Sequence, residues 1–339
     1  MNPAQVQKKS FSAPPGEEVL APDLLGPEKK PLRFGTRGWI RPIETGEIDQ
    51  ALGLFLADQS DSHRQISGKT ASFLELAQQE RYDLTRQIVA FYDDQLVHAG
   101  LFVPQPGGTA FVFLSRPASV DSEQWELAAQ ALRELCRWAF LEGSNLLQVL
   151  IEPTDSVRRD LCLAADFTRL TDLIYMFGTG DNAPAPERND GDLRWLGYDQ
   201  QHHDLFKQVI KQTYQGSQDC PELEELRNME DVILCHKAAG KFDKRLWKLL
   251  IRGDNPVGAL LLIPLRAPNA MELTYMGLCP GARGEGLGAF MLHEAIACAR
   301  QYQNRILTLA VDCRNRKAYQ LYHKFGLKIV LRRSVLIRS

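Results

Sequence analysis

The chain has 339 residues, a length that suits two domains better than one. Its net charge of −2, with 44% hydrophobic and 24% charged residues, is ordinary for a globular protein and offers no electrostatic basis for binding nucleic acid or a membrane surface. No apolar stretch is long enough to span a bilayer, and the seven cysteines show neither a C-x-x-C pair nor a zinc-binding spacing with histidine. We therefore predict a cytoplasmic protein with reduced thiols and with no metal, membrane or nucleic-acid partner.

Two segments rich in proline or glycine divide the chain. Residues 1–31 are polar and rich in proline, which predicts a flexible tail. Residues 179–191 combine glycine, proline, asparagine and aspartate, which predicts a linker. The expected domains therefore cover residues 32–178 and 192–339.

The two expected domains carry the same pattern of strands. An apolar run at residues 146–151 has a counterpart at 306–311, an offset of 306 − 146 = 160 residues. The turns at Asp94 and Asp254, each between two apolar runs, share this offset, since 254 − 94 = 160. A repeat of this length predicts two copies of one α/β domain.

The copies differ after their third strand. In the first copy the apolar run 111–114 is followed by Ser-Arg-Pro-Ala-Ser, without glycine. In the second copy the run that ends at Leu278 leads into Cys-Pro-Gly-Ala-Arg-Gly-Glu-Gly-Leu-Gly over residues 279–288, and a helical pattern of apolar residues follows. Glycines let backbone N–H groups approach a ligand, and a helix N-terminus adds unpaired donors and partial positive charge. This combination predicts a site for a phosphate group.

The loop also fits the relaxed dinucleotide fingerprint, with Gly284, Gly286 and Ala289 in the glycine-x-glycine-x-x-alanine pattern. Asp312 follows Ala289 by 312 − 289 = 23 residues, near the place of a ribose-binding acid. Against this interpretation, residues 279–283 separate the strand from the loop, and only 339 − 312 = 27 residues remain for the rest of a doubly wound sheet. A nicotinamide-dependent oxidoreductase is therefore the weaker alternative.

Two motifs of the second copy, in this order, resemble those of the GNAT N-acyltransferases. Arg283, Gly286 and Gly288 form an arginine-x-x-glycine-x-glycine loop after a leucine-x-proline strand end, similar to the acyl-CoA pyrophosphate loop of that family. The segment 315–327 reads asparagine-x-x-alanine-x-x-leucine-tyrosine and ends in phenylalanine-glycine-leucine, similar to the family's second motif. The resemblance implies an α/β (α+β) fold of two GNAT-like domains, each a mixed, mostly antiparallel sheet flanked by helices. The first copy, which lacks the loop, is expected to be degenerate.

The resemblance also assigns the residues that bind the acyl-CoA. The end of the strand before the loop is expected to leave its neighbour, so that free backbone N–H groups face the thioester and the pantetheine arm. Asn315 is expected to contact the pantetheine, to cap the following helix, or both. The expected acyl-CoA-binding residues are Met276, Leu278, Arg283, Gly284, Gly286, Leu287, Gly288 and Asn315.

Two further residues are candidates for the chemistry. Glu272, on the strand before the loop, matches the place of a carboxylate base in several family members, and strand alternation predicts that Glu272, Thr274, Met276 and Leu278 share one face. Tyr322 matches the family's tyrosine near the CoA sulfur, which can protonate the departing thiolate. A solvent-facing glutamate and a tyrosine packed in the core are the competing interpretations.

The loop after the helical pattern at 199–211 mixes polar side chains, and its Tyr214 and Asp219 are either candidates for orienting the acceptor amine or parts of an ordinary surface loop. We therefore predict an N-acyltransferase that moves an acetyl or other acyl group from acetyl-CoA (or another acyl-CoA) to an amine of a small molecule, peptide or protein, with no metal. The alternative is a non-catalytic acyl-CoA-binding sensor or scaffold. The acceptor, the acyl chain length and the oligomeric state are left open.

Overall fold

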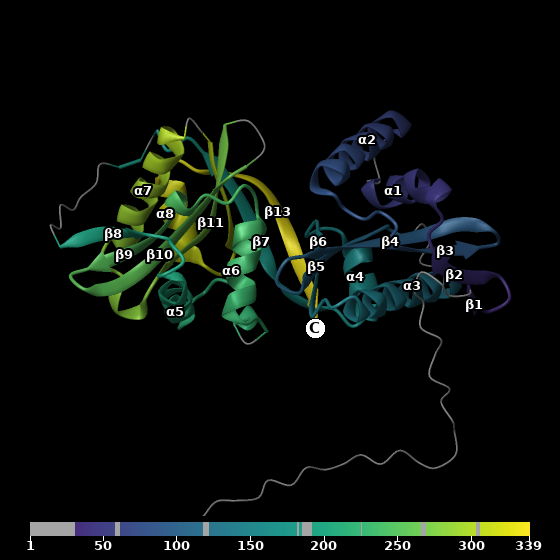
Figure 1. Cartoon of the computed structure of the whole chain (residues 1–339). Coiled ribbons are helices and arrows are strands. Elements are labelled where there is room, and N and C mark those ends of the chain that lie inside the picture. Colours follow the sequence, from purple (N-terminus) through teal and green to yellow (C-terminus); the bar gives the residue numbers. More distant parts are fainter. Residues whose placement is uncertain are drawn as a thin grey trace, which may run out of the picture.

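The computed structural model describes residues 31–57, 62–117, 122–181, 183–184, 192–224, 226–265, 269–302 and 306–339. Within these residues the chain forms one mixed sheet of 13 strands with helices on both faces (Figure 1). The predicted fold class is confirmed. The predicted tail, apart from its last residue, and most of the predicted linker lie outside the described residues, and the domain limits at 178 and 192 stay predictions.

The two halves of the chain contain the same succession of elements, apart from β1 and short 3-10 turns, which confirms the predicted repeat. The first half contains β1 (Leu32–Phe34), β2 (Gly38–Pro42), α1 (Ile48–Leu56), α2 (His63–Glu80), β3 (Gln87–Tyr92), β4 (Gln95–Gln105), β5 (Thr109–Leu114), α3 (Ser122–Leu141), β6 (Leu146–Ile151), α4 (Ser156–Ala164) and β7 (Thr168–Gly178). The second half contains β8 (Leu193–Gly197), α5 (His203–Tyr214), α6 (Met229–Ala238), β9 (Trp247–Arg252), β10 (Asn255–Pro264), β11 (Ala270–Leu278), α7 (Leu287–Gln301), β12 (Ile306–Asp312), α8 (Arg316–Lys324) and β13 (Lys328–Arg338).

The two halves exchange their last strands. The order across the sheet is β1-β2-β3-β4-β5-β6-β13-β7-β12-β11-β10-β9-β8. Thus β13 pairs with β6, with Leu336 opposite Val149, and β7 pairs with β12, with Met176 opposite Leu309. Among the described strands, the pairs β5–β6 and β11–β12 are parallel and the other neighbours are antiparallel. Because of the exchange, each half completes the sheet of the other.

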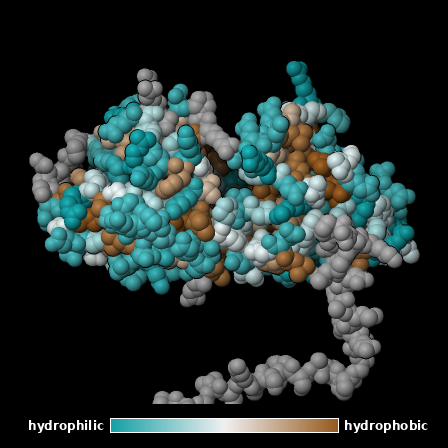
Figure 2. All heavy atoms as spheres, viewed as in Figure 1, coloured by the Kyte–Doolittle hydropathy of each residue, from teal (hydrophilic) through white to brown (hydrophobic). Residues whose placement is uncertain are grey.

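Helices cover both faces of each half. In the first half, α3 and α4 share one core with Leu127, while α1 and α2 share another with Phe55 on the opposite face. In the second half, α7 and α8 share a core with Met291, and α5 and α6 share one with Phe206. The surface is hollowed between the two halves (Figure 2). None of the described helices is both long and apolar enough to cross a membrane.

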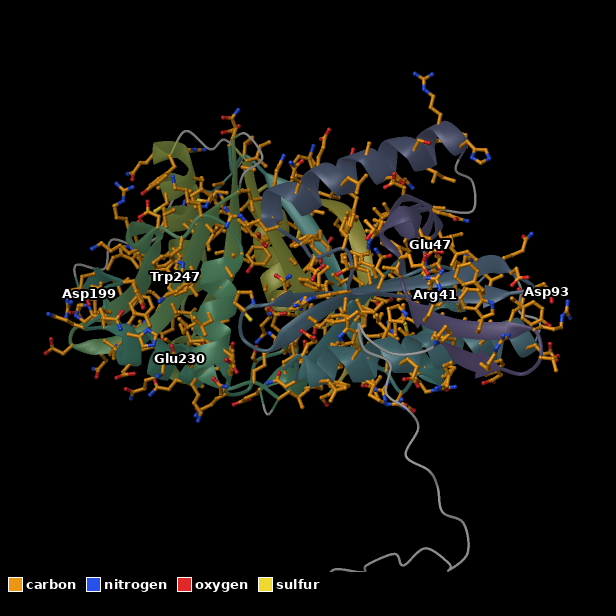
Figure 3. The ribbon with its side chains drawn as sticks, turned by 45° about the vertical axis from the view of Figure 1, so that its right-hand side comes forward. Arg41, Glu47, Asp93, Asp199, Glu230 and Trp247 are labelled. Carbon is orange, nitrogen blue, oxygen red and sulfur yellow. The ribbon has the colours of Figure 1, made fainter. Side chains whose placement is uncertain are left out.

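Local sequence patterns explain how the outer strands of both halves are fixed. All six residues of β3 are buried, as expected for a strand covered on both faces. Arg41 of β2 forms an ion pair with Glu47 of the next turn, with 2.7 Å between Nη1 and Oε2 (Figure 3). Trp247, at the start of β9, has no exposed surface and packs edge-on against Tyr198, with 5.4 Å between ring centroids (Figure 3). These contacts hold the outer parts of the sheet, and the functional residues lie toward its centre.

Candidate active site

The parallel strands β11 and β12 diverge partway along their length. Their pairing ends at Glu272 opposite Thr308. Beyond this point β11 continues to Leu278 and β12 to Asp312 without pairing with each other. The predicted separation of the two strands is confirmed, and it leaves the facing backbone edges free to bind a ligand.

The glycine loop lies directly after the diverging end of β11. Gly284 and Gly286 have φ angles of 83° and 82°, a left-handed conformation that residues with side chains disfavour. Gly286 is the N-cap of α7, and no side chain caps the helix there. A Cβ atom added at either glycine would meet no atom within 4 Å. The first turn of α7, which begins at Leu287 and Gly288, thus offers unpaired N–H groups to open space, and this arrangement fits a phosphate group.

Arg283 fastens this loop to the loop that follows α5. Its Nε donates to the carbonyl of Leu278 (3.0 Å), its Nη2 to the carbonyl of Thr213 (2.8 Å) and its Nη1 to the carbonyl of Gly216 (3.1 Å). The guanidinium therefore holds the end of β11 against the loop that follows α5. Its contact with CoA stays a prediction.

A β-bulge interrupts β11 next to the divergence. Leu261 of β10 pairs with Tyr275, but the following residue, Leu262, pairs with Leu273. Thr274 is left without a partner across the strands, and its hydroxyl donates to the carbonyl of Leu261 (3.2 Å). A bulge of this kind shifts every later side chain of the strand to the opposite face.

The bulge overturns the predicted grouping of side chains on β11. Met276 and Leu278 pack with the same core as Met271 and Leu273, on the side of α7 and α8. Glu272 lies between Met271 and Leu273 and therefore points to the other face. The prediction that Glu272 shares a face with Met276 and Leu278 is wrong, because the extra residue reverses the alternation.

Glu272 is suited to accept a proton at the divergence. It is half-buried, and burial raises the pKa of its carboxyl above the ordinary value. The phenol of Tyr175, from β7 of the first half, lies near it: burial raises the pKa of Tyr175, and the charge of Glu272 raises it further. The exchanged strand thus brings a residue of the first half to the candidate base.

Tyr322 lies on the other side of the gap. It is 6% exposed on α8, and burial, together with the charge of Asp219, raises the pKa of its phenol well above the usual range. Asn315 caps α8, with its Oδ1 accepting from the backbone N–H of Ala318 (3.2 Å), so the predicted capping role is confirmed. Leu321 of α8 lies 3.3 Å from the place of a Cβ at Gly288, and this close approach positions α8 beside the first turn of α7.

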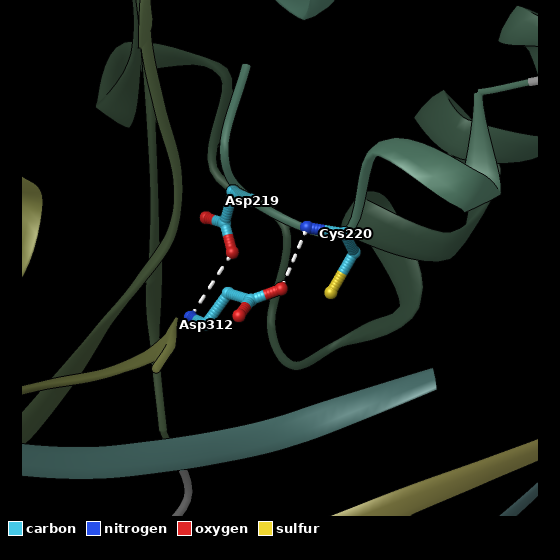
Figure 4. Close-up of side chains that lie close together, drawn as sticks. All are labelled: Asp219, Cys220 and Asp312. Atoms are coloured by element: carbon cyan, nitrogen blue, oxygen red, sulfur yellow. Dashed lines mark hydrogen bonds between the residues drawn. The ribbon is translucent and has the colours of Figure 1, made fainter. Parts of the chain in front are cut away.

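The loop after α5 reaches the end of β12. Oδ1 of Asp219 accepts from the backbone N–H of Asp312 (3.1 Å), and the N–H of Cys220 donates to Oδ2 of Asp312 (3.0 Å) (Figure 4). The Asp219 residue as a whole is exposed to solvent. Its carboxyl group is nevertheless surrounded by protein atoms, and this burial raises its pKa to about 6. Asp219 therefore lies at the point where β12 ends, and its role in binding the acceptor stays a prediction.

Asp312 is a structural anion and not a ribose-binding acid. Its side chain has no exposed surface, and it accepts from Thr171 of β7 (2.7 Å) and pairs with Arg314 (2.7 Å). Burial opposes its ionisation, but these bonds lower its pKa to about 2. Ligand atoms of Asp219, Cys220 and Asp312 lie within 4.8 Å of one another, but the Asp312 carboxylate is neutralised by Arg314 and serves to anchor the loop. The dinucleotide interpretation is wrong, because Asp312 is occupied and the sheet is mostly antiparallel.

Aromatic residues pack between the end of α5 and β11. Tyr214 packs edge-on against Tyr275, with 5.9 Å between centroids, and burial raises the pKa of Tyr214 to about 12. The hydroxyls of Tyr275 and Thr213 are 2.5 Å apart. Sequence reasoning did not identify Tyr275, Thr171 or Tyr175, since the first depends on the bulge and the other two on the strand exchange.

The matching gap of the first half contains an arginine. β5 and β6 are paired over only three positions and then separate in the same way. Nε of Arg158 donates to the carbonyl of Leu114 at the end of β5 (3.2 Å), and Nη1 pairs with Asp155 (3.0 Å). At the offset of 160 residues the second half has Ala318 and Asn315. Arg158 thus lies in the gap of the first half, where it lines a cavity of ≈ 140 Å³ with Leu114 and Ile151.

Comparison with known proteins agrees with this geometry. Residues 210–327 match the model of the acetyltransferase (GNAT) family, and this segment contains the diverging strands, the glycine loop and Tyr322. No curated protein matches the sequence significantly.

Solved structures support the same fold over most of the chain. The GCN5-related N-acetyltransferase from Sphaerobacter thermophilus is similar with a TM-score of 0.60 at 16% identity, over 90% of this chain and 96% of that one. A GCN5-related glucosamine N-acetyltransferase region of a fungal multi-domain GH3 beta-N-acetylglucosaminidase is similar with a TM-score of 0.54 at 12% identity, over 89% of this chain and 38% of that one. The match to the GNAT family model covers residues 210–327, and over most of its length the chain has the same fold as the Sphaerobacter thermophilus structure. This similarity supports acyl-CoA-dependent N-acyl transfer as the general activity.

Proposed function

We propose that this protein transfers an acetyl group from acetyl-CoA to the amino group of an acceptor by direct attack. The observation that carries the proposal is the divergence of β11 from β12, which opens directly onto the glycine loop at the N-terminus of α7. In the first half the same divergence lacks the glycine loop and contains Arg158, and this difference supports the second half as the catalytic one.

Acetyl-CoA would be held mainly by backbone groups of the second half. The pyrophosphate lies against the N–H groups from Gly284 to Gly288, where the helix dipole of α7 favours negative charge. The pantetheine arm follows the free edge of β11 between Met276 and Leu278, which brings the thioester into the gap. The amide nitrogen of Asn315, whose oxygen already caps α8, is left to bind the pantetheine.

The acyl transfer then follows from the groups around the gap. The amine nitrogen attacks the thioester carbonyl carbon, a backbone N–H of β11 stabilises the oxyanion, and the C–S bond breaks as the tetrahedral intermediate collapses. Glu272 accepts the proton of the ammonium, directly or through water, while the charge of Asp219 attracts the ammonium. Tyr322, whose phenol burial keeps protonated, gives its proton to the CoA thiolate, and the proton that the attacking nitrogen loses as the amide forms restores the phenol.

The first test is calorimetric titration of acetyl-CoA into the protein and into two glycine variants. Gly286→Glu places a bulky, negatively charged side chain in the glycine loop, and we expect it to abolish acetyl-CoA binding. Gly46→Glu makes the same change at an exposed glycine of the first half, where a Cβ meets no atom within 4 Å, and we expect it to bind as the wild type does. Unchanged affinity of Gly286→Glu would refute the loop assignment.

Measuring the release of CoA thiol distinguishes an acyltransferase from a non-catalytic acyl-CoA-binding sensor. A panel of amines is incubated with acetyl-CoA, and free CoA thiol is measured with a chromogenic disulfide. We expect amine-dependent release that is lost in Gly286→Glu. Tight binding without release for any amine would favour the non-catalytic acyl-CoA-binding alternative.

A further inference from the structure

An arginine between α5 and α6 carries a guanidinium group that has no partner among the described residues. Arg227 is half-buried, and its Nε is enclosed by protein atoms without a hydrogen-bond acceptor. Within the described part of the chain, its Nη atoms donate no hydrogen bond and form no ion pair either. Arg283 and Arg314, which also contact the loop after α5, are both bonded, to three backbone carbonyls and to the carboxylates of Asp312 and Glu222. Because a buried charge costs free energy unless it is paired, the guanidinium of Arg227 indicates a site for an anionic ligand.

The guanidinium lies beside the aromatic rings that pack between α5, α6 and β11. Tyr275 of β11 contacts both Tyr214 at the end of α5 and His236 of α6, with 5.9 and 5.6 Å between ring centroids. Burial raises the pKa of Tyr214 to about 12, and the positive charge of Arg227 opposes this rise. Burial lowers the pKa of His236 to about 4, and the same positive charge lowers it further. Arg227 is therefore close to Tyr214 and His236, the two rings that flank Tyr275.

The first half of the chain fixes α6 beside these rings. The Sγ of Cys235 on α6 donates to the carbonyl of Pro106, in the turn between β4 and β5 (2.9 Å). Gly107 of that turn approaches the helix so closely that a Cβ there would lie 2.6 Å from the carbonyl oxygen of Asp231. Burial raises the pKa of Cys235 and the charge of Arg227 opposes this rise, so the guanidinium also lies near Cys235. The space around Arg227 is thus bounded by a helix whose position depends on both halves.

Asp219 supplies the opposite charge on the side of the gap. It accepts from the backbone N–H of Asp312, which lies 312 − 308 = 4 residues beyond the last β12 residue that pairs with β11. Tyr275 lies 275 − 272 = 3 residues beyond the last paired residue of β11, so Asp219 and Tyr275 are at about the same level of the gap. The pKa of Tyr214 responds to burial, to the charge of Arg227 and to that of Asp219, yet the two charged groups form no ion pair with each other. A ligand with a cation at Asp219 and an anion at Arg227 would pair both.

We propose that Arg227 binds a carboxylate of the acceptor while Asp219 holds its ammonium group, so that the substrate class is an amino acid. The inference rests on the proposed acyl transfer, since the amine must lie at the gap between β11 and β12. A planar guanidinium with free N–H donors matches the geometry of a carboxylate, and one arginine balances the charge of one carboxylate. The rings of Tyr214 and Tyr275 then border the part of the acceptor that joins its two charged groups.

The test compares three amino acids with their carboxamides, which have nearly the same shape but lack the negative charge. The acids are phenylalanine, 4-aminobutyrate and 6-aminohexanoate, so that the separation of amine and carboxylate varies. We expect the wild type to have, for at least one pair, a kcat/KM that is roughly ten- to hundredfold higher for the acid, mostly through KM. Arg227→Gln should bring this ratio close to one. Lys211→Gln is the matched control, because it removes a positive charge from an exposed position of α5, and it should keep the ratio of the wild type.

Calorimetric titration of the three acids in the presence of CoA separates this inference from the proposed function. Binding that is weakened in Arg227→Gln but not in Lys211→Gln, without release of thiol from acetyl-CoA, would support the carboxylate site and refute the acyl transfer. Acetylation of acids and amides with equal kcat/KM would support the acyl transfer and refute the carboxylate site. A preference for the acid that survives in Arg227→Gln would refute the role of Arg227. Failure of the wild type to bind or acetylate any of the three acids would refute the carboxylate site as well.

Discussion

The two gaps between diverging parallel strands share one architecture and differ in what fills them. In the second half the gap between β11 and β12 opens onto the glycine loop, and Glu272 stands at the last paired position. In the first half the gap between β5 and β6 has Phe111 at that position, and Arg158 reaches into it. The backbone geometry is the same in both halves, while the side chains around the gap differ. The fold therefore provides the gap, and a few side chains decide whether it binds a ligand.

The first half also contributes residues to the proposed catalytic site. Through the exchanged strand β7 it supplies Thr171, which donates to Asp312, and Tyr175, which lies near Glu272. The second half supplies Arg333 to the first through β13. Neither gap is built from its own half alone.

The largest effect is expected from the carboxylate that joins the halves. Asp312→Ala leaves Arg314 and Thr171 without their buried acceptor, and we expect a loss of about 3–5 kcal/mol in the free energy of unfolding. Asp155→Ala in the first half is the matched change, and its effect should be smaller because Arg158 keeps the carbonyl of Leu114 as an acceptor. Urea denaturation followed by circular dichroism measures both. Equal losses would contradict the asymmetry between the halves.

Glu272→Gln tests the base that the first half lacks. We expect kcat/KM to fall by about a hundredfold at neutral pH, the lower end of the range for a general base. A base acts in its ionised form, so the wild-type rate should fall as the pH drops through the raised pKa of Glu272. In Glu272→Gln this acidic limb should disappear. If the rate of Glu272→Gln fell with decreasing pH as the wild-type rate does, the titrating group would be another residue. The variant Asp219→Asn would then test Asp219, whose pKa is raised to about 6.

Tyr322→Phe tests the proton donor on the other side of the gap. We expect kcat to fall by about tenfold, because CoA thiolate is a tolerable leaving group even without a positioned acid. Acetyl-CoA affinity should stay within about twofold, since the ring that packs in the core remains. Tyr319→Phe, on the same helix, is the control and should keep full activity. Wild-type turnover by Tyr322→Phe would leave Tyr322 as a packing residue.

The smallest effect is expected from clearing the gap of the first half. Arg158→Ala removes hydrogen bonds to backbone carbonyls and should lower the free energy of unfolding by about 1–2 kcal/mol. It should not create a second acetyl-CoA site, because the first half has no glycine loop. Calorimetry should therefore give one site per chain in both proteins. Two acetyl-CoA sites in Arg158→Ala would show that Arg158 alone prevents the first half from binding acetyl-CoA.

Local features of this fold could be predicted from the sequence, and non-local ones could not. The left-handed glycines at Gly284 and Gly286 and the capping asparagine at Asn315 depend on neighbouring residues, and the repeat depends on spacing. The strand exchange depends on whether β6 pairs with β7 or with β13. Because β7 and β13 have the same place in the repeat, the sequence pattern does not distinguish between them. The bulge at Thr274 has no marker residue such as glycine, so Glu272 was expected on the wrong face.

The exchange of β7 and β13 has a consequence for the order of folding during synthesis. Val149 of the first half pairs with Leu336 of β13, so this contact closes a loop of 336 − 149 = 187 residues. Until β13 has been synthesised, β6 has an unpaired edge, and an exposed strand edge is a template for pairing with another chain. We expect the nascent protein to depend on chaperones until β13 emerges from the ribosome, and its two halves to resist separation into independently folding pieces.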